Sequence, residues 1–220
     1  MGSGVRRPAG LCTADLIQDK ESGRWLALRN RRLEEEQGAA HPIPSSHSRR
    51  NRLARLVWGI VWAVLFRPSP TALHCWRRAL LRAFGASIGS GVHVYPSAKV
   101  WAPWRLVMGD NSCLGPQVDC YNVGGVEVAA GATVSQYSYL CGATHNYRRL
   151  DLPLVTGRIT LGPRCWVGAD AFVGPGVTIG EGSVVGARAS VYRDVAAWVV
   201  VVGNPAKVLK GREMEGEGNG

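Results

Sequence analysis

From Ile88 onward, aliphatic residues recur every six positions, apart from extra two-residue steps at 106–107 and 126–127 and a gap before Leu161. This period limits the possible folds more than any other feature of the chain. The aliphatic residues are Ile88, Val94, Val100, Met108, Leu114, Val128, Val134, Leu140, Leu161, Val167, Val173, Ile179, Val185 and Val191, and Cys120 and Ala197 fill two further slots in register. The period matches neither the helical repeat of about 3.6 residues nor the alternation of a simple strand. It is typical of a parallel β-helix, in which each aliphatic side chain stacks on its counterparts in neighbouring coils.

Small residues support the same interpretation. The residue after each aliphatic position is often Gly, and the residue four positions further on is nearly always small or β-branched. Such residues fit a tight corner, and glycine lets the backbone turn there at little steric cost. Trp104 is the one misfit to this rule of small residues. Three hexads make one coil, so coils are expected to begin near residues 88, 108, 128, 161 and 179. We therefore predict an all-β fold, a left-handed parallel β-helix of hexapeptide repeats with an N-terminal α-helical segment, where the handedness comes only from the family resemblance described below.

Composition divides the chain into four parts. Residues 1–50 are polar and charged and are expected to form a disordered or weakly structured basic extension, with at most a short helix around residues 24–37. Residues 51–86 are expected to be helical, with one helix ending before Pro68 and a second capped by Thr71. The β-helix follows over residues 87–202, interrupted by a loop at 146–160, and a C-terminal motif occupies residues 203–220.

Positive charge is concentrated before the repeats. The net charge is +10, and no acidic residue stands between Glu36 and Asp110. Two interpretations of the basic, Trp-rich segment 49–82 are open. It covers one end of the β-helix and its unpaired strand edges, which we favour, or it lies on an anionic membrane surface, and both can hold. The apolar run from Leu56 to Phe66 is too short for a spanning helix, which needs about 20 residues.

The six cysteines show no CxxC pair and no spacing typical of a disulfide framework. Several occupy repeat positions that suit a small buried residue, which favours reduced thiols packed in the core. The first 15 residues lack the apolar region of a secretory signal. We therefore expect a cytoplasmic protein, with membrane association left open, and no nucleic-acid partner.

Histidine is the residue type best suited to remove a proton near neutral pH, because its unperturbed pKa is about 6.5. Among the five histidines, His93 and His145 both occupy the last position of a hexad. The two differ in the next stretch of chain, because only His145 directly precedes the 146–160 interruption. Long loops in a regular scaffold are usually functional, so His145 is the stronger candidate.

The repeats and their closing motifs resemble the hexapeptide-repeat acyltransferases of the maltose/galactoside acetyltransferase type, and more narrowly the colanic-acid-biosynthesis acetyltransferase branch. The residues that carry the resemblance are Cys165-Trp-Val-Gly-Ala169, Val173-Gly-Pro-Gly-Val-Thr-Ile179, Val185-Gly-Ala187, Gly203-Asn-Pro-Ala-Lys207, Arg67-Pro-Ser-Pro70 and Leu80-Leu-Arg-Ala-Phe-Gly85. The resemblance covers residues 52–212 approximately. It implies a left-handed β-helix and a homotrimer whose active sites lie between subunits.

The same resemblance implies a co-substrate, an acceptor and site residues. The co-substrate is acetyl-CoA, the acceptor is a carbohydrate, and His145 is the catalytic base. Asn122 loosely matches an asparagine of the acceptor pocket, with a corner-stabilising role equally open. The backbone N–H of Ala169 is implied as the oxyanion donor, and Trp166 either contacts ligand or packs between coils. The CoA contacts implied are Ala169, Ala187, Tyr192, Arg193, Lys207 and Lys210, with no metal.

Two other functional classes remain to be distinguished. A γ-type carbonic anhydrase is also a β-helix trimer, but its zinc site needs three imidazoles and the repeats offer only His93 and His145. A non-catalytic β-helix would serve as an assembly module. Within the acetyltransferase interpretation N-acetylation stays open, and O-acetylation is favoured because no additional nucleotide-binding domain is present.

Overall fold

The computed structural model describes residues 16–18, 25–27 and 48–214. Contacts divide the chain into two units, one up to Ser45 and one from Ser46 onward. In the first unit, β1 (Leu16–Gln18) and β2 (Trp25–Ala27) pair antiparallel. A strand at Trp25–Ala27 replaces the beginning of the helix expected around residues 24–37, and the rest of that helix and most of the predicted extension lie outside the described residues.

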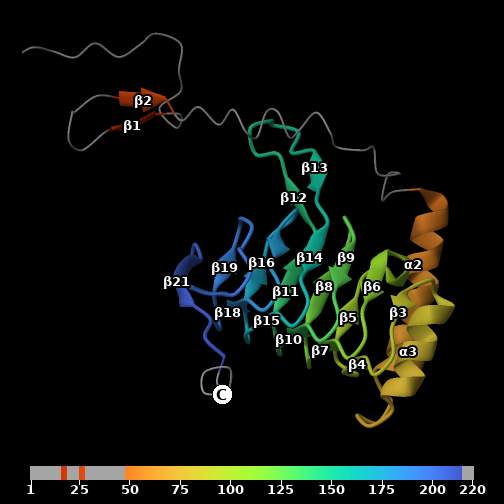
Figure 1. Cartoon of the computed structure of the whole chain (residues 1–220). Helices are drawn as coiled ribbons and strands as arrows, with labels where there is room; N and C mark the ends of the chain where they lie inside the picture. The colour runs from red at the N-terminus through yellow and green to blue at the C-terminus, as the bar shows by residue number, and fades with distance from the viewer. Residues whose placement is uncertain (1–15, 19–24, 28–47, 215–220) are drawn as a thin grey trace, which may run out of the picture. The chain divides into compact units, whose positions relative to one another are not determined.

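The second unit is a parallel β-helix whose coils stack along one axis, from β3 beside the helices to β20 and β21 at the far end (Figure 1). Each coil contributes one short strand to each of three faces. The first face contains β3 (Ser87–Ile88), β6 (Leu106–Met108), β9 (Val126–Val128), β14 (Ile159–Leu161) and β17 (Thr178–Ile179). The second contains β4 (His93–Val94), β7 (Cys113–Leu114), β10 (Thr133–Val134), β15 (Trp166–Val167), β18 (Val184–Val185), β20 (Val199–Val202) and the antiparallel β21 (Lys207–Gly211). The third contains β5 (Lys99–Val100), β8 (Asp119–Tyr121), β11 (Tyr139–Cys141), β16 (Phe172–Val173) and β19 (Ser190–Val191).

The core is the stack of side chains predicted from the period. Every predicted aliphatic position from Ile88 to Val191 is buried, including Cys120. The last predicted position is wrong. Ala197 is exposed, and Val195 takes its place, pairing in parallel with Ile179. The fold prediction, a parallel β-helix of hexapeptide repeats with an N-terminal α-helical segment, is confirmed.

Trp104, the misfit of the repeat, lies in a 3-10 turn, η4 (Pro103–Arg105), that widens the corner between β5 and β6. The spacing from Val100 to Met108 is eight residues instead of six, and the two extra residues are accommodated at this corner, which leaves the stacking of Val100, Met108 and Cys120 intact.

Two helices cover the first coil. Helix α2 (Arg49–Val61) continues into the π-helical turn η3 (Trp62–Phe66), and α3 (His74–Ala83) follows after Pro68 and Pro70. The predicted Thr71 cap is wrong, because α3 begins three residues later and its N-cap, Leu73, has no side-chain hydrogen bond. Within the described residues, no helix combines the length and the apolar character that crossing a bilayer requires.

The helices satisfy the carbonyl groups that the first coil leaves without a strand partner. On the third face the indole N–H of Trp58 donates to the Val100 carbonyl at 2.7 Å. On the second face Arg77 Nε donates to the Val94 carbonyl at 2.6 Å, and on the first face Arg82 donates to the Ile88 carbonyl. Because an unpaired edge strand is a template for aggregation, these bonds end the β-helix in a stable way.

Candidate active site

His145 ends the strand β12 (Ala143–His145), which leaves the coil stack at the corner between the third and first faces. Strand β13 (Leu154–Thr156) returns antiparallel to it, with His145 opposite Leu154. The two strands form an arm that projects from the side of the β-helix (Figure 1). The interruption of the repeat after His145 therefore lies in an ordered hairpin.

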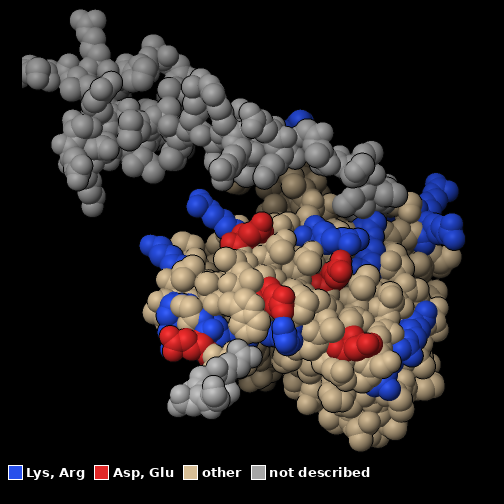
Figure 2. All heavy atoms as spheres, in the orientation of Figure 1, with Lys and Arg blue, Asp and Glu red and all other residues tan. Residues whose placement is uncertain are grey.

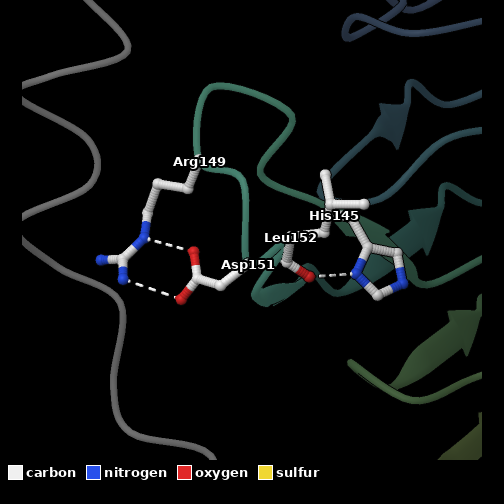
Figure 3. Close-up of polar contacts among 4 residues, drawn as sticks. All are labelled: His145, Arg149, Asp151 and Leu152. Atoms are coloured by element: carbon white, nitrogen blue, oxygen red, sulfur yellow. Dashed lines mark hydrogen bonds and ion pairs between the residues drawn. The ribbon is translucent and has the colours of Figure 1, made fainter.

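The hairpin orients the imidazole of His145. Nδ1 lies 2.5 Å from the backbone carbonyl oxygen of Leu152, seven residues further along the chain (Figure 3). A carbonyl oxygen only accepts hydrogen bonds, so Nδ1 carries the proton and donates it. In the neutral ring Nε2 is then left as the basic nitrogen. The group that orients the imidazole is thus the Leu152 carbonyl.

Leu152 itself has an uncommon backbone conformation. Its φ is +44°, in the left-handed region that branched side chains seldom adopt. Such residues persist where the surrounding structure demands them, and they cluster at functional sites. Here this conformation belongs to the residue whose carbonyl accepts the His145 bond.

The hairpin tip is held by its own polar contacts. The Asn146 side chain accepts from the Arg148 N–H at 3.1 Å, and the Asn146 N–H donates to the Pro153 carbonyl at 2.9 Å. Arg149 donates to both carboxylate oxygens of Asp151, at 2.9 and 2.8 Å (Figure 3). This hydrogen-bonded guanidinium lowers the pKa of Asp151. Asn146 therefore organises the turn, whereas the imidazole is held by the Leu152 carbonyl.

Glycines allow the hairpin to leave and rejoin the coil. A Cβ added at Gly124 would lie 2.4 Å from the Gly157 oxygen, and one added at Gly157 would lie 2.4 Å from the Gly176 nitrogen. No side chain fits at those distances, so successive coils touch through backbone at this corner. Leu152 and Gly157 are positioning residues that sequence reasoning missed, and the glycine-rich repeat next to the loop was the available signal for Gly157.

The corner between the second and third faces carries Ala169 and Ala187, one coil apart. Their coils are joined by the Arg188 N–H, which donates to the Ala169 carbonyl at 2.9 Å. In the described part of the chain, no hydrogen bond uses the N–H of Ala169 or of Ala187. Both residues are at least partly exposed, so two backbone donors lie uncommitted along one edge. A ligand with carbonyl or oxyanion groups fits such an edge.

Trp166 stands on the outer surface of the second face beside this edge. About half of its side chain is exposed, and its indole N–H donates to Ser135 Oγ at 2.8 Å. The bond fixes the ring across two coils. Trp166 is therefore anchored to the neighbouring coil and still presents a flat apolar surface, so this geometry fits both of its interpretations.

The other predicted CoA contacts fall into two groups. Lys207 and Lys210 lie on β21, with Lys207 opposite Val202 close to the corner that carries Ala187, and both are exposed. Tyr192 and Arg193 lie at the other edge of the third face, where the Tyr192 ring packs on Phe172 with centroids 5.4 Å apart. Arg212 donates to the Gly182 carbonyl at 2.7 Å, so it fastens the C-terminal strand.

Asn122 has a structural role in the described chain. It is fully buried, its Oδ1 accepts from the Ala102 N–H at 2.9 Å, and its Nδ2 donates to the Ala102 carbonyl at 2.8 Å. It therefore fixes the corner between the third and first faces, one coil from the hairpin. His93 lies on β4, where its ring packs on His74 with centroids 4.6 Å apart.

In a single chain the predicted site residues are divided between two corners of the β-helix. His145 lies at the corner where the third face meets the first, whereas Ala169 and Ala187 lie at the corner where it meets the second. The paired strands of the third face separate the two corners, with Tyr139 opposite Phe172. Within a single chain, the imidazole and the uncommitted N–H groups are thus at opposite edges of one sheet.

Cysteine and metal chemistry add little at this site. Five cysteines within the described residues are free thiols; burial raises the pKa of Cys165 to about 12 and also raises that of Cys120. Cys120 and Cys165 pack in the core as predicted, whereas Cys75 is exposed. Among residues 16–18, 25–27 and 48–214, no three His, Cys, Asp or Glu side chains gather closely enough to hold a metal ion.

Comparisons with known proteins agree with this geometry. A family model described as bacterial transferase hexapeptide (six repeats) matches residues 158–193. The putative colanic acid biosynthesis acetyltransferase WcaF of Escherichia coli K12 is 41% identical over 170 residues, which cover 77% of this chain and 93% of that protein. Two solved structures share the fold. A maltose O-acetyltransferase of Clostridium difficile 630 has a TM-score of 0.69 at 21% identity, covering 77% of this chain and 91% of that one. A hexapeptide-repeat containing acetyltransferase of Vibrio cholerae, complexed with acetyl coenzyme A, has a TM-score of 0.68 at 22% identity, covering 77% and 92%.

Proposed function

The chain belongs to the hexapeptide-repeat acetyltransferases, and we propose that it transfers the acetyl group of acetyl-CoA to a hydroxyl of a sugar or of a lipid-linked saccharide, with His145 as general base. The observation that carries this proposal is the hydrogen bond from His145 Nδ1 to the Leu152 carbonyl. It fixes the tautomer in which Nε2 is free to accept a proton, and it anchors the ring on a hairpin outside the coil stack.

Three groups would share the reaction. Acetyl-CoA supplies an activated acyl group as a thioester. His145 Nε2 removes the proton of the attacking hydroxyl and returns it to the departing thiolate. The Ala169 N–H donates to the carbonyl oxygen as negative charge develops there, a contribution that is typically worth about 3–4 kcal/mol.

The corner between the second and third faces, which carries Ala169 and Ala187, suits the co-substrate. The pantetheine arm of CoA carries amide groups, and the uncommitted N–H groups of Ala169 and Ala187 line one edge at consecutive coils. Lys207 lies at the end of that edge and Lys210 three residues further along β21, both exposed and without an acidic partner among the ion pairs of the described residues. Lysine ammonium groups bind phosphate as point charges, so these two residues fit the nucleotide phosphates.

The separation of His145 from Ala169 supports a site shared between copies of the chain. A homotrimer with head-to-tail contacts would place the hairpin of one subunit against the Ala169–Ala187 edge of the next. The hairpin has the surface for such a contact, because Tyr147, Leu150, Leu152, Leu154 and Val155 are all exposed in one chain. A cluster of exposed apolar side chains of this kind marks an interaction surface.

A thiol-release assay tests the function. Purified protein is incubated with acetyl-CoA and a panel of free sugars, amino sugars and lipid-linked saccharides, and the liberated thiol is measured. We expect acceptor-dependent release and a product whose mass rises by one acetyl group. Loss of that group in mild base identifies an ester, whereas a base-stable product would show N-acetylation and refute transfer to oxygen.

A further inference from the structure

The basic residues of the N-terminal segment divide into two sets once the helices are in place. Arg77, Arg78 and Arg82 donate to carbonyl groups of the first coil, and Arg55 lies over the Trp101 ring at 4.4 Å. These residues are committed to the protein. The second set is Arg49, Arg50, Arg52 and Arg67, all exposed, and of these only Arg67 has a ring contact within the described residues, with its guanidinium 5.4 Å from the centroid of Trp62.

No carboxylate neutralises the second set within the described residues, because none of the ion pairs found there includes one of these arginines. The nearest acidic residues in sequence are Glu36 and Asp110. In Figure 2, blue side chains project where Figure 1 draws α2, and no red side chain is visible beside them on that face. This end of the molecule therefore presents uncompensated positive charge.

The outer side of α2 and η3 is apolar. Leu53, Leu56, Ile60 and Val64 are 62%, 62%, 58% and 63% exposed, and Val57 is also exposed. Their spacing of three or four residues places them on one side of a helix. The opposite side is already in use, since Trp58 and Phe66 are buried against the first coil. The apolar stripe is thus not needed to hold the helix in place.

The stripe continues into a groove at the end of η3. A cavity of about 450 Å³ is lined there by Val64, Leu65, Pro68, Ser69, Pro70, Leu73 and Trp76, where η3 faces the start of α3. The exposed apolar surface therefore extends from Leu53 in the second turn of α2 to Trp76 in the first turn of α3. Contiguous apolar patches of this kind usually mark interaction sites.

We propose that the outer face of α2 and η3 binds the surface of an anionic phospholipid bilayer. A helix that lies in the interface pairs an apolar stripe with flanking Lys and Arg, and here Arg49, Arg50 and Arg52 flank one end and Arg67 the other. Charge favours a lipid surface over a protein groove as the partner. Residues 37–109 contain no carboxylate side chain, which matches the uniformly negative surface of an anionic bilayer. The helix axis then lies along the bilayer, and the coil stack extends away from it.

Membrane attachment is independent of the acetyl transfer proposed above. It gives the helical segment two functions, one on each side. The inner side ends the β-helix and the outer side holds the enzyme at a membrane, so the two interpretations of residues 49–82 both apply.

Vesicle co-sedimentation of the full chain tests the proposal. Large vesicles of phosphatidylcholine alone and of phosphatidylcholine with about one third phosphatidylglycerol are compared at low and high salt. We expect binding to the anionic vesicles, weaker binding to the neutral ones, and a clear decrease as salt screens the arginines. Absence of binding to anionic vesicles at low salt would overturn the proposal.

Two variants locate the binding surface. Leu53→Gln/Leu56→Gln removes apolar contact and is expected to reduce vesicle partitioning about tenfold or more. Arg49→Gln/Arg52→Gln is expected to reduce it about thirtyfold on anionic vesicles only, at about 1 kcal/mol for each cation.

The matched control is Val208→Gln/Leu209→Gln, whose side chains are 64% and 62% exposed on β21 at the other end of the stack. It is expected to bind vesicles as the parent does. Equal loss in the control and in the α2 variants would contradict a surface on α2. A change in oligomer size in the Leu53/Leu56 variant without vesicles would show that a second copy covers the stripe, which also contradicts the proposal.

Discussion

At the residue scale, the sequence was sufficient to single out His145 but not the group that orients it. The position before the only long interruption of the repeat distinguished His145 from His93. The orienting carbonyl belongs to Leu152, and it reaches the ring because β13 folds back on β12. A backbone carbonyl carries no residue-type signal, so this partner could not be read from the sequence. The same applies to Asn122, whose amide bonds only the backbone of Ala102 in the described chain.

Lys207 provides a prediction at this scale. Lys207→Glu is expected to weaken acetyl-CoA binding by about tenfold or more, since one attraction to phosphate becomes a repulsion at an exposed site. Isothermal titration calorimetry measures the affinity. Thermal stability should stay nearly unchanged, because Lys207 has no ion-pair partner among the described residues to lose.

Lys207→Arg is the matched control and should retain most of the affinity, because it keeps the cation. Unchanged affinity in Lys207→Glu would refute the phosphate role. An equal loss in both variants would mean that the lysine acts through something other than its charge.

At the element scale, the period of six predicted the coils because each position in it has a fixed burial. The pattern holds from Ile88 to Val191 and fails at Ala197, where the chain shortens the corner and Val195 enters the core. Nothing in the residue types marks a corner that is two residues shorter than the others. The register of the last core position was therefore predicted wrongly. The hairpin was also beyond the pattern, since β12 and β13 pair with each other and not with a coil.

The capping helices give a prediction at this scale. Trp58→Phe keeps an aromatic ring but removes the N–H that donates to the Val100 carbonyl, leaving a buried acceptor unpaired. The free energy of unfolding is expected to fall by about 1–3 kcal/mol in a denaturant titration. Trp76→Phe is the matched control, because its indole N–H also donates to a carbonyl, that of Leu65 at 3.0 Å, but at an exposed site where water can replace the donor, so the substitution should cost less than about 0.5 kcal/mol. Equal effects of the two substitutions would contradict the capping role of Trp58.

At the scale of the whole molecule, family membership settles the enzyme class, whereas the trimer with shared sites is a proposal that rests on the geometry of one chain. The sequence left a non-catalytic module open, and the match to acetyltransferases along most of the chain decides for an acyltransferase. The proposed active site is divided in one chain, since His145 and Ala169 lie at opposite edges of the third face. His145 and Ala169 are close in sequence, so the sequence gives no sign that they are far apart in space. Their separation becomes visible only when the chain is wound into coils.

Mixed oligomers test the shared site. His145→Ala and Lys207→Glu chains are co-expressed and assayed at low acetyl-CoA, where each variant alone should keep about one tenth of the parent activity or less. If each site takes its base from one subunit and its CoA edge from the next, random mixing restores about one quarter of the sites. Activity no higher than the sum of the separate variants would show that each chain carries a complete site.

The turnover of His145→Ala tests the central claim most directly. Acceptor-dependent thiol release is measured for the parent, for His145→Ala and for His93→Ala, after circular dichroism has shown that all three are folded. We predict that His145→Ala loses about 10²–10⁴-fold in turnover while His93→Ala stays close to the parent. A His145→Ala protein that releases CoA at the parent rate would contradict the assignment of His145 as the base and the mechanism built on it.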